Sequence, residues 1–325
     1  MRVGIDVSPL RQTRAGTARY LERLLPHLER LVTVERLAFG RAGRASTLAR
    51  DAWWYPVALP LRARGLDVLH CPSFRGPLRS RTPLVVTVHD LAVLRHPDAF
   101  NRWTRTYSRL SVPRVVRAAD RVIAVSEFTK RELVEVLGVA EERIHVVPNA
   151  VAAPFVPEGP RGEGDYVLAV GTLEPRKNLP RLAAATRRVG LELRIVGARG
   201  WGEVGVSAGD DIRFLGFVPD EELARLYRGA LCVAYPSLYE GFGIPVLEAL
   251  ACAAPVVTSE ASAMAEVAGD AAVLVDPREV DAIAAGIAEA IARRDELARL
   301  GPERASRYTW AASAEATVDV YKELA

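Results

Sequence analysis

The sequence predicts an α/β protein built from two doubly wound, Rossmann-like parallel sheets, and three observations lead to this fold class. Short β-branched runs alternate with longer segments of helical periodicity along the whole chain, which is the pattern of βαβ units. The alternation pauses over residues 152–165, a proline- and glycine-rich stretch typical of a linker. The chain has 325 residues, a length that suits two domains better than one.

Five strands are predicted in the first half, because each run is short and apolar on both faces, as in a parallel sheet. They cover residues 2–7, 67–70, 84–89, 121–125 and 143–147. Apolar residues at helical spacing predict helices over residues 17–31, 102–118 and 127–137. Ser126 directly precedes the last of these helices, and we expect it to be the N-cap, since a serine oxygen accepts hydrogen bonds from the first turn.

The second half repeats this rhythm with six predicted strands, over residues 166–170, 191–196, 212–215, 231–235, 255–258 and 272–275. Helices are predicted over residues 178–189, 220–228, 244–251, 280–294 and about 310–324. We expect Asp220, after Pro219, to cap the second of these helices.

These elements predict an N-terminal domain over residues 1–155 and a C-terminal domain over residues 165–308. A C-terminal helix, residues 309–325, is expected to pack back toward the N-terminal domain. Open parallel sheets bind ligands at the carboxyl ends of their strands, so we expect the two domains to face a central cleft.

Composition excludes several functional classes. Lysine and arginine total 43 against 40 aspartates and glutamates, too small an excess for a dedicated nucleic-acid-binding protein. The three cysteines are far apart in sequence and support neither a disulfide framework nor a zinc site. No apolar run reaches the ~18 residues of a membrane-spanning helix, and the N-terminus leads directly into a strand. We therefore expect a cytoplasmic protein.

The most informative segment is YPSLYEGFGIPVLE, residues 235–248. Glu240 precedes Gly241 and Gly243, which allow backbone amides to approach a ligand closely. Glu248 lies one turn into the helix that follows. Carboxylates suit vicinal hydroxyls and a helix N-terminus suits a phosphate, so the segment fits a sugar nucleotide. A capped surface helix with two solvated glutamates fits the spacing equally well.

A second segment, GTLEPRKN, covers residues 171–178, directly after a predicted strand and before a helix. Arg176 and Lys177 are adjacent cations at this position, which suits a diphosphate. A departing diphosphate gains charge, so fixed cations also stabilise the transition state. The alternative is an ordinary strand–helix turn with solvated basic residues, but the position at a strand end favours ligand binding.

Together the two segments resemble the retaining glycosyltransferases of family four, which have the GT-B fold. Glu240 and Glu248 match the family's Glu-x7-Glu signature, and EPRKN matches its diphosphate-binding turn. The likeness extends over nearly the whole chain, with further matches in RAGTARY (14–20), TVHDL (87–91), VSEF (125–128) and VPNAV (147–151).

The resemblance implies a role for each residue of the first segment. Glu248 would bind the ribose hydroxyls of the donor. Glu240 would hold the donor sugar, together with Gly241 and the backbone amides of Phe242 and Gly243.

It also implies that Arg176 and Lys177 hold the diphosphate, that Gly16 lets the N-terminal loop approach donor or acceptor, and that His89 lies near the reacting centre. The sequence departs from the family at Thr172, where many members carry an arginine directly after the glycine. Arg176 is the candidate replacement, so its own role is less defined than that of Lys177.

Two histidines end predicted strands, where a lone histidine is more often structural. The position of His89 before Asp90, together with the family match, favours a role in the site. Asp90 either orients His89 or caps the next segment. His70 is interpreted as structural or as part of the acceptor side. The segment GARGWG, residues 197–202, does not have the GxGxxG spacing, so a dinucleotide site there is weakly supported.

Aromatic and basic residues of the first half form a separate pattern. They are Trp53, Trp54, Tyr55, Arg62 and Arg64, followed by Arg102, Arg105, Arg109, Arg114 and Arg117. A solvated helix face is the simpler interpretation. The alternative is a surface that associates peripherally with the inner face of a membrane, or that binds an acidic acceptor.

The sequence has no Asp-x-Asp triplet, the carboxylate pair with which many transferases hold a divalent metal. We therefore expect no metal and no other cofactor, with Arg176, Lys177 and a helix dipole in place of the ion.

The predicted reaction moves a hexosyl unit from a nucleotide diphospho-sugar to a hydroxyl of a glycan or lipid-linked acceptor, with retention. The resemblance implies that the departing phosphate takes the acceptor proton. GTLEPRKN and VGARGWG look most like mannosyltransferase-type members, which favours GDP-mannose, although no residue gives a signature for the base. The alternatives are a nucleotide-sugar epimerase or hydrolase on the same fold, and a non-catalytic sugar-nucleotide-binding subunit.

Overall fold

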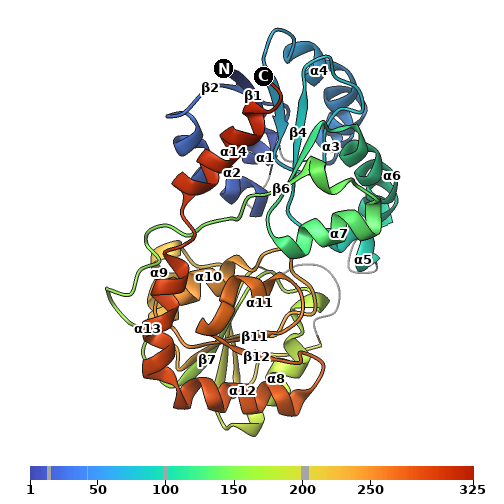
Figure 1. The fold of residues 1–325 in the computed structure, drawn as a ribbon. Helices are drawn as coiled ribbons and strands as arrows, with labels where there is room; N and C mark the ends of the chain where they lie inside the picture. The colour runs from blue at the N-terminus through green and yellow to red at the C-terminus, as the bar shows by residue number, and fades with distance from the viewer. Residues whose placement is uncertain (13–15, 42, 98–101, 199–204) are drawn as a thin grey trace. The chain divides into compact units, whose positions relative to one another are not determined.

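The structure, a computed structural model, describes residues 1–12, 16–41, 43–97, 102–198 and 205–325 (Figure 1). The chain divides into two compact units, each with one six-stranded sheet. Residues 1–95, 102–149 and 310–325 form the first unit, and residues 96–101 and 150–309 form the second. Every strand pairing within the two sheets is parallel, which confirms the predicted GT-B-type fold class of two Rossmann-like sheets.

The sheet of the first unit has the strand order β2-β1-β3-β4-β5-β6. Its strands are β1 (Arg2–Asp6), β2 (Thr33–Leu37), β3 (Val68–Cys71), β4 (Leu84–Val88), β5 (Arg121–Ala124) and β6 (Ile144–Val146). The longer helices are α2 (Gly16–Leu28), α6 (Arg102–Ala118), α7 (Glu127–Leu137) and α14 (Trp310–Lys322), and α1 (Ser8–Gln12) and α5 (Ala92–Arg95) are short. Ser126 caps α7, as predicted, because its side chain accepts from the amide of Thr129 at 3.0 Å.

Two elements of the first unit were not predicted. β2 is an edge strand of sequence TVERL that is buried only at Leu37, so it lacks the apolar pattern of an inner strand. A continuous helix covers residues 44–62 as α3 (Arg44–Ala49), a π-helical segment (Arg50–Ala58) and α4 (Leu59–Arg62). Pro56 has no amide hydrogen, and the amide of Leu59 reaches back five residues to the carbonyl of Trp54.

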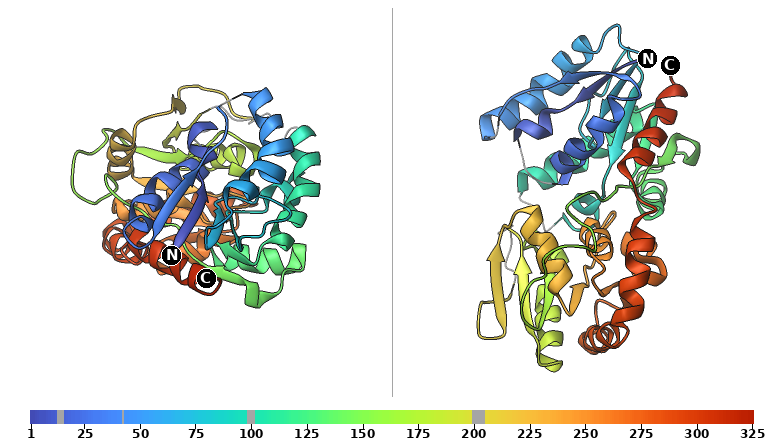
Figure 2. Two further views of the ribbon diagram at one scale, coloured as in Figure 1. Left: turned by 90° about the horizontal axis from the view of Figure 1, so that it is seen from above. Right: turned by 90° about the vertical axis from the view of Figure 1, so that its left-hand side faces the viewer.

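The last helix belongs to the first unit. α14 lies along α2 (Figure 1). The ring centroids of Trp310 on α14 and Tyr20 on α2 are 5.9 Å apart. Further along α14, the hydroxyl of Ser313 donates to the carbonyl of Pro148 at 2.7 Å, and Tyr321 contacts His70. The two ends of the chain lie at the same end of this unit (Figure 2).

The sheet of the second unit has the strand order β12-β11-β10-β7-β8-β9. Its strands are β7 (Tyr166–Val170), β8 (Glu192–Val196), β9 (Ile212–Gly216), β10 (Cys232–Tyr235), β11 (Val256–Ser259) and β12 (Val273–Val275). α8 (Leu179–Arg188) and α12 (Val280–Ala292) share one apolar core with these strands. The remaining helices are α9 (Asp220–Gly229), α10 (Ile244–Ala251), α11 (Ala263–Ala268) and α13 (Arg294–Ala305).

Several helix predictions are corrected. α2 ends at Leu28 rather than at residue 31, and α12 ends at Ala292, after which α13 follows as a separate, unpredicted helix. α11 was also not predicted. Asp220 is not the cap of α9: Pro219 occupies the N-cap position, and Asp220 begins the acidic first turn, where its charge favours the positive end of the helix dipole.

Candidate functional site

The turn after β7 is held by close contact between two glycines. Gly171 has φ +143°, and a Cβ there would lie 3.1 Å from Cε of Lys177. A Cβ on Gly197 would lie only 1.9 Å from the carbonyl oxygen of Gly171. Gly197 therefore allows the turns after β7 and β8 to pack together. The rest of the 197–202 segment, from residue 199 onward, lies outside the described residues.

Asn178 joins three turns at this end of the sheet. It is buried and adopts the left-handed conformation, with φ 60°. Its side-chain amide donates to the carbonyls of Pro236 at 3.1 Å and Pro277 at 2.6 Å. The amide of Leu238 donates to the carbonyl of Arg176 at 2.8 Å. These bonds fix the two predicted motifs relative to each other.

The two motifs meet in a buried cluster of charges. Glu240 Oε1 lies 2.6 Å from Lys177 Nζ, and Glu240 Oε2 lies 2.8 Å from Arg176 Nη1. Arg176 Nη2 also pairs with Glu174 Oε1 at 2.7 Å. The structure thus brings together three of the predicted site residues and adds Glu174, which was not predicted as part of the site. We call Glu174, Arg176, Lys177 and Glu240 the charge cluster; it holds two cations and two carboxylates.

Burial and ion pairing shift the pKa values of the charge cluster in opposite directions. Burial alone would raise the pKa of Glu240, but the charges of Lys177 and Arg176 hold that pKa at about 2. Burial lowers the pKa of Lys177, and Glu240 partly offsets the effect. Glu240 therefore remains an ionised hydrogen-bond acceptor at neutral pH.

Tyr235 completes the charge cluster and was not predicted as a site residue. The hydroxyl of this buried residue donates to Glu240 Oε1 at 3.1 Å, and Lys177 Nζ donates to the same hydroxyl. Lys177 Nζ also lies 4.8 Å from the centre of the Tyr235 ring, within range of a cation–π interaction. The only signal for Tyr235 was its place at the start of the YPSLYEGFG segment, at the end of a buried strand.

The glycine turn leads into α10. Gly243 is the N-cap residue with φ +98°, a conformation that glycine adopts readily. Phe242 is buried edge-on against the Tyr308 ring at 5.8 Å. The amide of Glu240 donates to Ser262 Oγ at 3.3 Å, another contact that no sequence motif indicated. The positive end of the α10 dipole therefore lies directly after the charge cluster.

Glu248 is buried on α10 and is held by α9. Glu248 Oε2 accepts from the hydroxyl of Tyr227 at 3.1 Å. Burial, with the nearby Glu248 carboxylate, raises the pKa of Tyr227 well above its usual value. Glu248 thus has a fixed orientation one turn beyond Gly243.

His89 belongs to the first unit and has a defined tautomer. His89 Nε2 lies 3.1 Å from the carbonyl of Pro72; a carbonyl only accepts, so Nε2 carries the hydrogen and Nδ1 keeps a lone pair. Burial lowers the pKa of His89, which favours the neutral ring. Asp90 accepts from the amide of Ala92 at 3.0 Å and so caps the segment that follows.

Gly16 also belongs to the first unit and begins α2. A Cβ added at this glycine would meet no atom of the described residues within 4 Å. Arg14 and Ala15, which precede it in the predicted glycine loop, lie outside the described residues.

His70 is a structural residue. Its two ring nitrogens contact the hydroxyl of Tyr321 at 2.6 Å and Thr87 Oγ1 at 2.8 Å. Burial lowers the pKa of His70 to about 3, so the ring is neutral in the folded protein.

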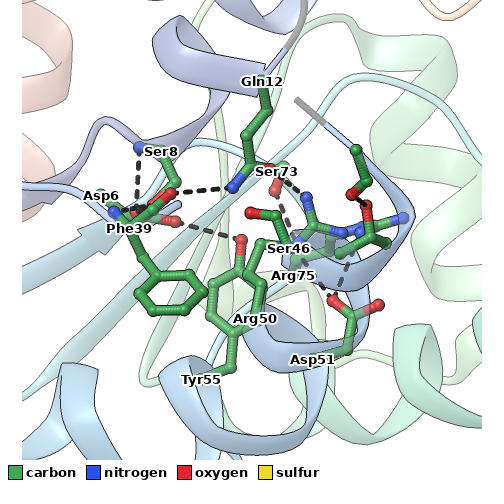
Figure 3. Close-up of polar contacts among 12 residues, drawn as sticks. Asp6, Ser8, Gln12, Phe39, Ser46, Arg50, Asp51, Tyr55, Ser73 and Arg75 are labelled. Atoms are coloured by element: carbon green, nitrogen blue, oxygen red, sulfur yellow. Dashed lines mark hydrogen bonds and ion pairs between the residues drawn. The ribbon is translucent and has the colours of Figure 1, made fainter. Parts of the chain in front are cut away.

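A polar network at the carboxyl end of β1 was also not predicted (Figure 3). Asp6 accepts from the amide of Ser8 at 3.1 Å and from the hydroxyl of Tyr55 at 3.1 Å. Beside it, Asp51 Oδ1 lies 3.0 Å from Arg50 Nε and 3.4 Å from Arg75 Nη1. Two guanidinium groups therefore share one buried carboxylate.

Within the described ranges, no three histidine, cysteine, aspartate or glutamate side chains cluster as metal ligands would. In the same ranges, no helix is both long and apolar enough to cross a bilayer.

The chain has two Rossmann-like sheets, and the second carries paired cations and a carboxylate just before a helix N-terminus. This combination defines a GT-B transferase whose site suits an anionic ligand rich in hydroxyls. The chain belongs to the glycosyltransferases: the family described as "Glycosyl transferases group 1" matches residues 155–307, and "Glycosyltransferase Family 4" matches residues 13–153.

Relatives with assigned activities support this membership. The O-antigen chain mannosyltransferase B of Escherichia coli is 32% identical over 285 residues, which cover 79% of this chain and 74% of that protein. The MMP alpha-(1->4)-mannosyltransferase of Mycolicibacterium hassiacum is 31% identical over 271 residues, 74% of this chain and 65% of that protein.

Solved structures match the fold over nearly the full chain. Sucrose-phosphate synthase from Thermosynechococcus elongatus has a TM-score of 0.80 at 20% identity, covering 99% of this chain and 98% of that one. HepE from Anabaena, solved with UDP and glucose, has a TM-score of 0.73 at 20% identity, covering 99% of each chain. The chain is therefore a glycosyltransferase that moves a hexosyl unit in glycan synthesis; the comparisons favour neither the epimerase or hydrolase nor the non-catalytic subunit.

Proposed function

We propose that this transferase moves a mannosyl unit from GDP-mannose to a hydroxyl of a growing polysaccharide or lipid-linked acceptor, with retention at the anomeric carbon. Two relatives more than 30% identical to the chain are named mannosyltransferases, which supports the choice of sugar. The observation that carries the proposal is the charge cluster, in which Glu240 contacts both Lys177 and Arg176.

The charge cluster suits a diphosphate next to a sugar. Lys177 and Arg176 are ion-paired with Glu240. When the donor binds, phosphate oxygens can replace Glu240 as acceptors of the hydrogen bonds from these two side chains. Glu240, ionised at neutral pH, would then accept from hydroxyls of the donor sugar. The amides of Phe242 and Gly243, before α10, would supply further donors, and Glu248 would bind the ribose hydroxyls.

The same groups would act on the reaction itself. Charge develops on the diphosphate as the bond to the sugar breaks, so fixed cations stabilise the transition state more than the ground state. We assign this role to Lys177 and Arg176, with no metal required. The departing phosphate would take the acceptor proton. His89 Nδ1, a lone-pair acceptor on a neutral ring, would bind a hydroxyl of the donor sugar.

Ligand-induced thermal stabilisation tests the donor. The protein is heated with GDP-, UDP- and ADP-sugars and with the free nucleotides, without added metal. A ligand that binds only the folded state stabilises it by about 2.7 kcal/mol at a hundred times its Kd. We expect GDP-mannose to give the largest shift, Lys177→Ala to reduce it, and Lys322→Ala, which removes a surface lysine, to leave it unchanged.

Glu240→Ala separates binding from turnover in the same experiment. GDP should still stabilise this variant, while transfer of mannose falls by about a hundredfold or more. Unchanged turnover would show that Glu240 does not hold the sugar. A shift only with UDP- or ADP-sugars would refute GDP-mannose as the donor.

A further inference from the structure

The segment that follows β11 runs beside the segment that follows β10. Thr258 and Tyr235 are register partners in the sheet, and Thr258 Oγ1 donates to the carbonyl of Tyr235 at 3.0 Å. One residue further, Ser259 Oγ donates to the carbonyl of Ser237 at 2.6 Å. Thr258 and Ser259 are both fully buried. Two side chains at the end of β11 therefore fix the backbone of the segment that leads to Glu240.

The contacts between the two segments continue as far as Glu240. Ser262 Oγ accepts from the amide of Glu240 at 3.3 Å, and the amide of Ala263 donates to the carbonyl of Glu240 at 3.4 Å. Two consecutive residues thus hold the backbone of Glu240 on both sides. The carboxylate of Glu240, in contrast, contacts Lys177 and Arg176. The backbone and the side chain of Glu240 are therefore fixed by different parts of the chain.

Ser262 has a backbone conformation that is unfavourable for serine. Its φ is 64° and its ψ is −163°, a region that almost only glycine populates. Ser262 is also the N-cap residue of α11, a helix that the structure describes completely, yet its side chain makes no capping bond there. A serine at an N-cap usually accepts from an amide of its own helix. The bond to Glu240 explains a serine at this position, whereas the local conformation and the helix do not.

We propose that Ser262 is a positioning residue for the donor sugar, because it holds the backbone of Glu240 while the carboxylate changes partners. The inference rests on the proposed function, in which phosphate oxygens bind Lys177 and Arg176 and Glu240 accepts from hydroxyls of the sugar. This exchange releases the side chain of Glu240 from two ion pairs, so only the backbone contacts then keep the carboxylate in place. Transfer depends closely on the geometry of the reacting groups, so a displaced carboxylate slows it.

Hydrogen exchange tests the contact without any substrate. In Ser262→Gly the hydroxyl is lost but the new residue suits the conformation, so we expect the midpoint of urea denaturation to stay equal or to rise. The amide of Glu240, followed by mass spectrometry of peptides that cover it, should nevertheless exchange at least roughly tenfold faster. Ser262→Thr keeps a hydroxyl and should keep the slow exchange, although a β-branched residue lowers the midpoint at this φ.

Turnover tests the role of Ser262 in the reaction, with release of GDP from GDP-mannose as the signal and methyl α-mannoside as the acceptor. We expect kcat to fall about tenfold in Ser262→Gly and to change less than about twofold in Ser262→Thr. The thermal shift given by GDP alone should be the same in both variants. In a Glu240→Ala background, Ser262→Gly should have no further effect on kcat, because Ser262 acts through Glu240.

The matched control is Ala253→Gly. Ala253 lies just after α10 in the same unit and has φ 56°, so glycine should relieve its backbone in the same way, with unchanged exchange at Glu240 and unchanged kcat. A purely structural role of Ser262 predicts the result of this control for Ser262→Gly as well.

Two results would overturn the inference. One is unchanged exchange of the Glu240 amide in Ser262→Gly, whatever the donor is, and the other is faster exchange with unchanged kcat. An unaltered chain that releases no GDP from GDP-mannose would refute the proposed donor instead, and the exchange of the Glu240 amide would then decide for or against Ser262.

Discussion

Polar groups gather at the carboxyl ends of both sheets, but the two units assemble them differently. In the second unit, Arg176 and Lys177 are adjacent in sequence and meet Glu240 from a second short segment, the one that follows β10. In the first unit, the network of Asp6, Arg50 and Arg75 draws on a strand end, an irregular helix and a loop. A site whose residues lie within two short segments can be recognised as sequence motifs. A network drawn from several separate elements depends on how those elements pack.

One glycine of each unit, Gly197 after β8 and Gly16 at the start of α2, gives the largest predicted effect. Gly197→Ala would place a Cβ 1.9 Å from the carbonyl oxygen of Gly171, so we expect a loss of more than about 3 kcal/mol in the free energy of unfolding. The Cβ of Gly16→Ala would meet no atom within 4 Å in the described part of the chain, and helix propensity favours alanine by up to ~1 kcal/mol. Urea denaturation of both variants measures the contrast; equal stabilities would refute it.

Acid should destabilise the first unit before the second. The folded-state pKa of His70 is about 3, below the usual 6.5, so the unfolded chain binds the proton first and stability falls as pH drops below about 6.5. The folded-state pKa of Glu240 is about 2, below the usual 4.5, so its contribution is present above about pH 4.5 and is lost only as pH approaches 2. Between about pH 7 and pH 4 we expect His70 to account for a loss on the order of 3 kcal/mol.

His70→Gln isolates this effect. The variant should be less stable at neutral pH, because its contacts with Tyr321 and Thr87 change, but its stability should vary less with pH in the same window. His27→Gln, on the outer part of α2, serves as the control and should follow the unaltered chain. Parallel pH profiles for all three proteins would contradict the assignment to His70.

The smallest predicted effect concerns Tyr235. Tyr235→Phe removes the hydroxyl between Lys177 and Glu240 but keeps the ring under the ammonium. Losing one hydrogen-bonding group of this kind costs about 1–2 kcal/mol, so we expect the KM for the donor to rise roughly tenfold with little change in kcat. Tyr166→Phe, whose hydroxyl bonds the carbonyl of Leu226, should alter stability alone. An unchanged KM in Tyr235→Phe would show that the charge cluster orients itself without this hydroxyl.

The sequence predicted eleven of the twelve strands to within one residue at each end, because inner parallel strands are short apolar runs with sharp limits. β2 was not predicted because an edge strand is exposed and carries charges. The helix over residues 44–62 was not predicted because Pro56 and Pro60 are typical of loops and its exposed side is apolar, the reverse of an ordinary amphipathic helix.

The charge cluster was predictable to the extent that it lies in motifs. Arg176, Lys177 and Glu240 were expected to act together, and the structure places them in contact. Tyr235 and Ser262 contact the site because neighbouring turns pack beside it, and no local sequence pattern indicates that packing. The roles of all the predicted site residues toward a ligand, those of Glu248, His89 and Gly16 included, stay predictions.

The contact between Gly171 and Gly197 also limits how this enzyme can diversify. A side chain at position 197 would displace the turn at Gly171, and a side chain at position 171 would press on Lys177 of the charge cluster, so both positions must stay glycine for this arrangement to be inherited. New donor preferences in descendants or in engineered variants must then arise from side chains that reach over these turns, while the path of the backbone beneath them stays constant.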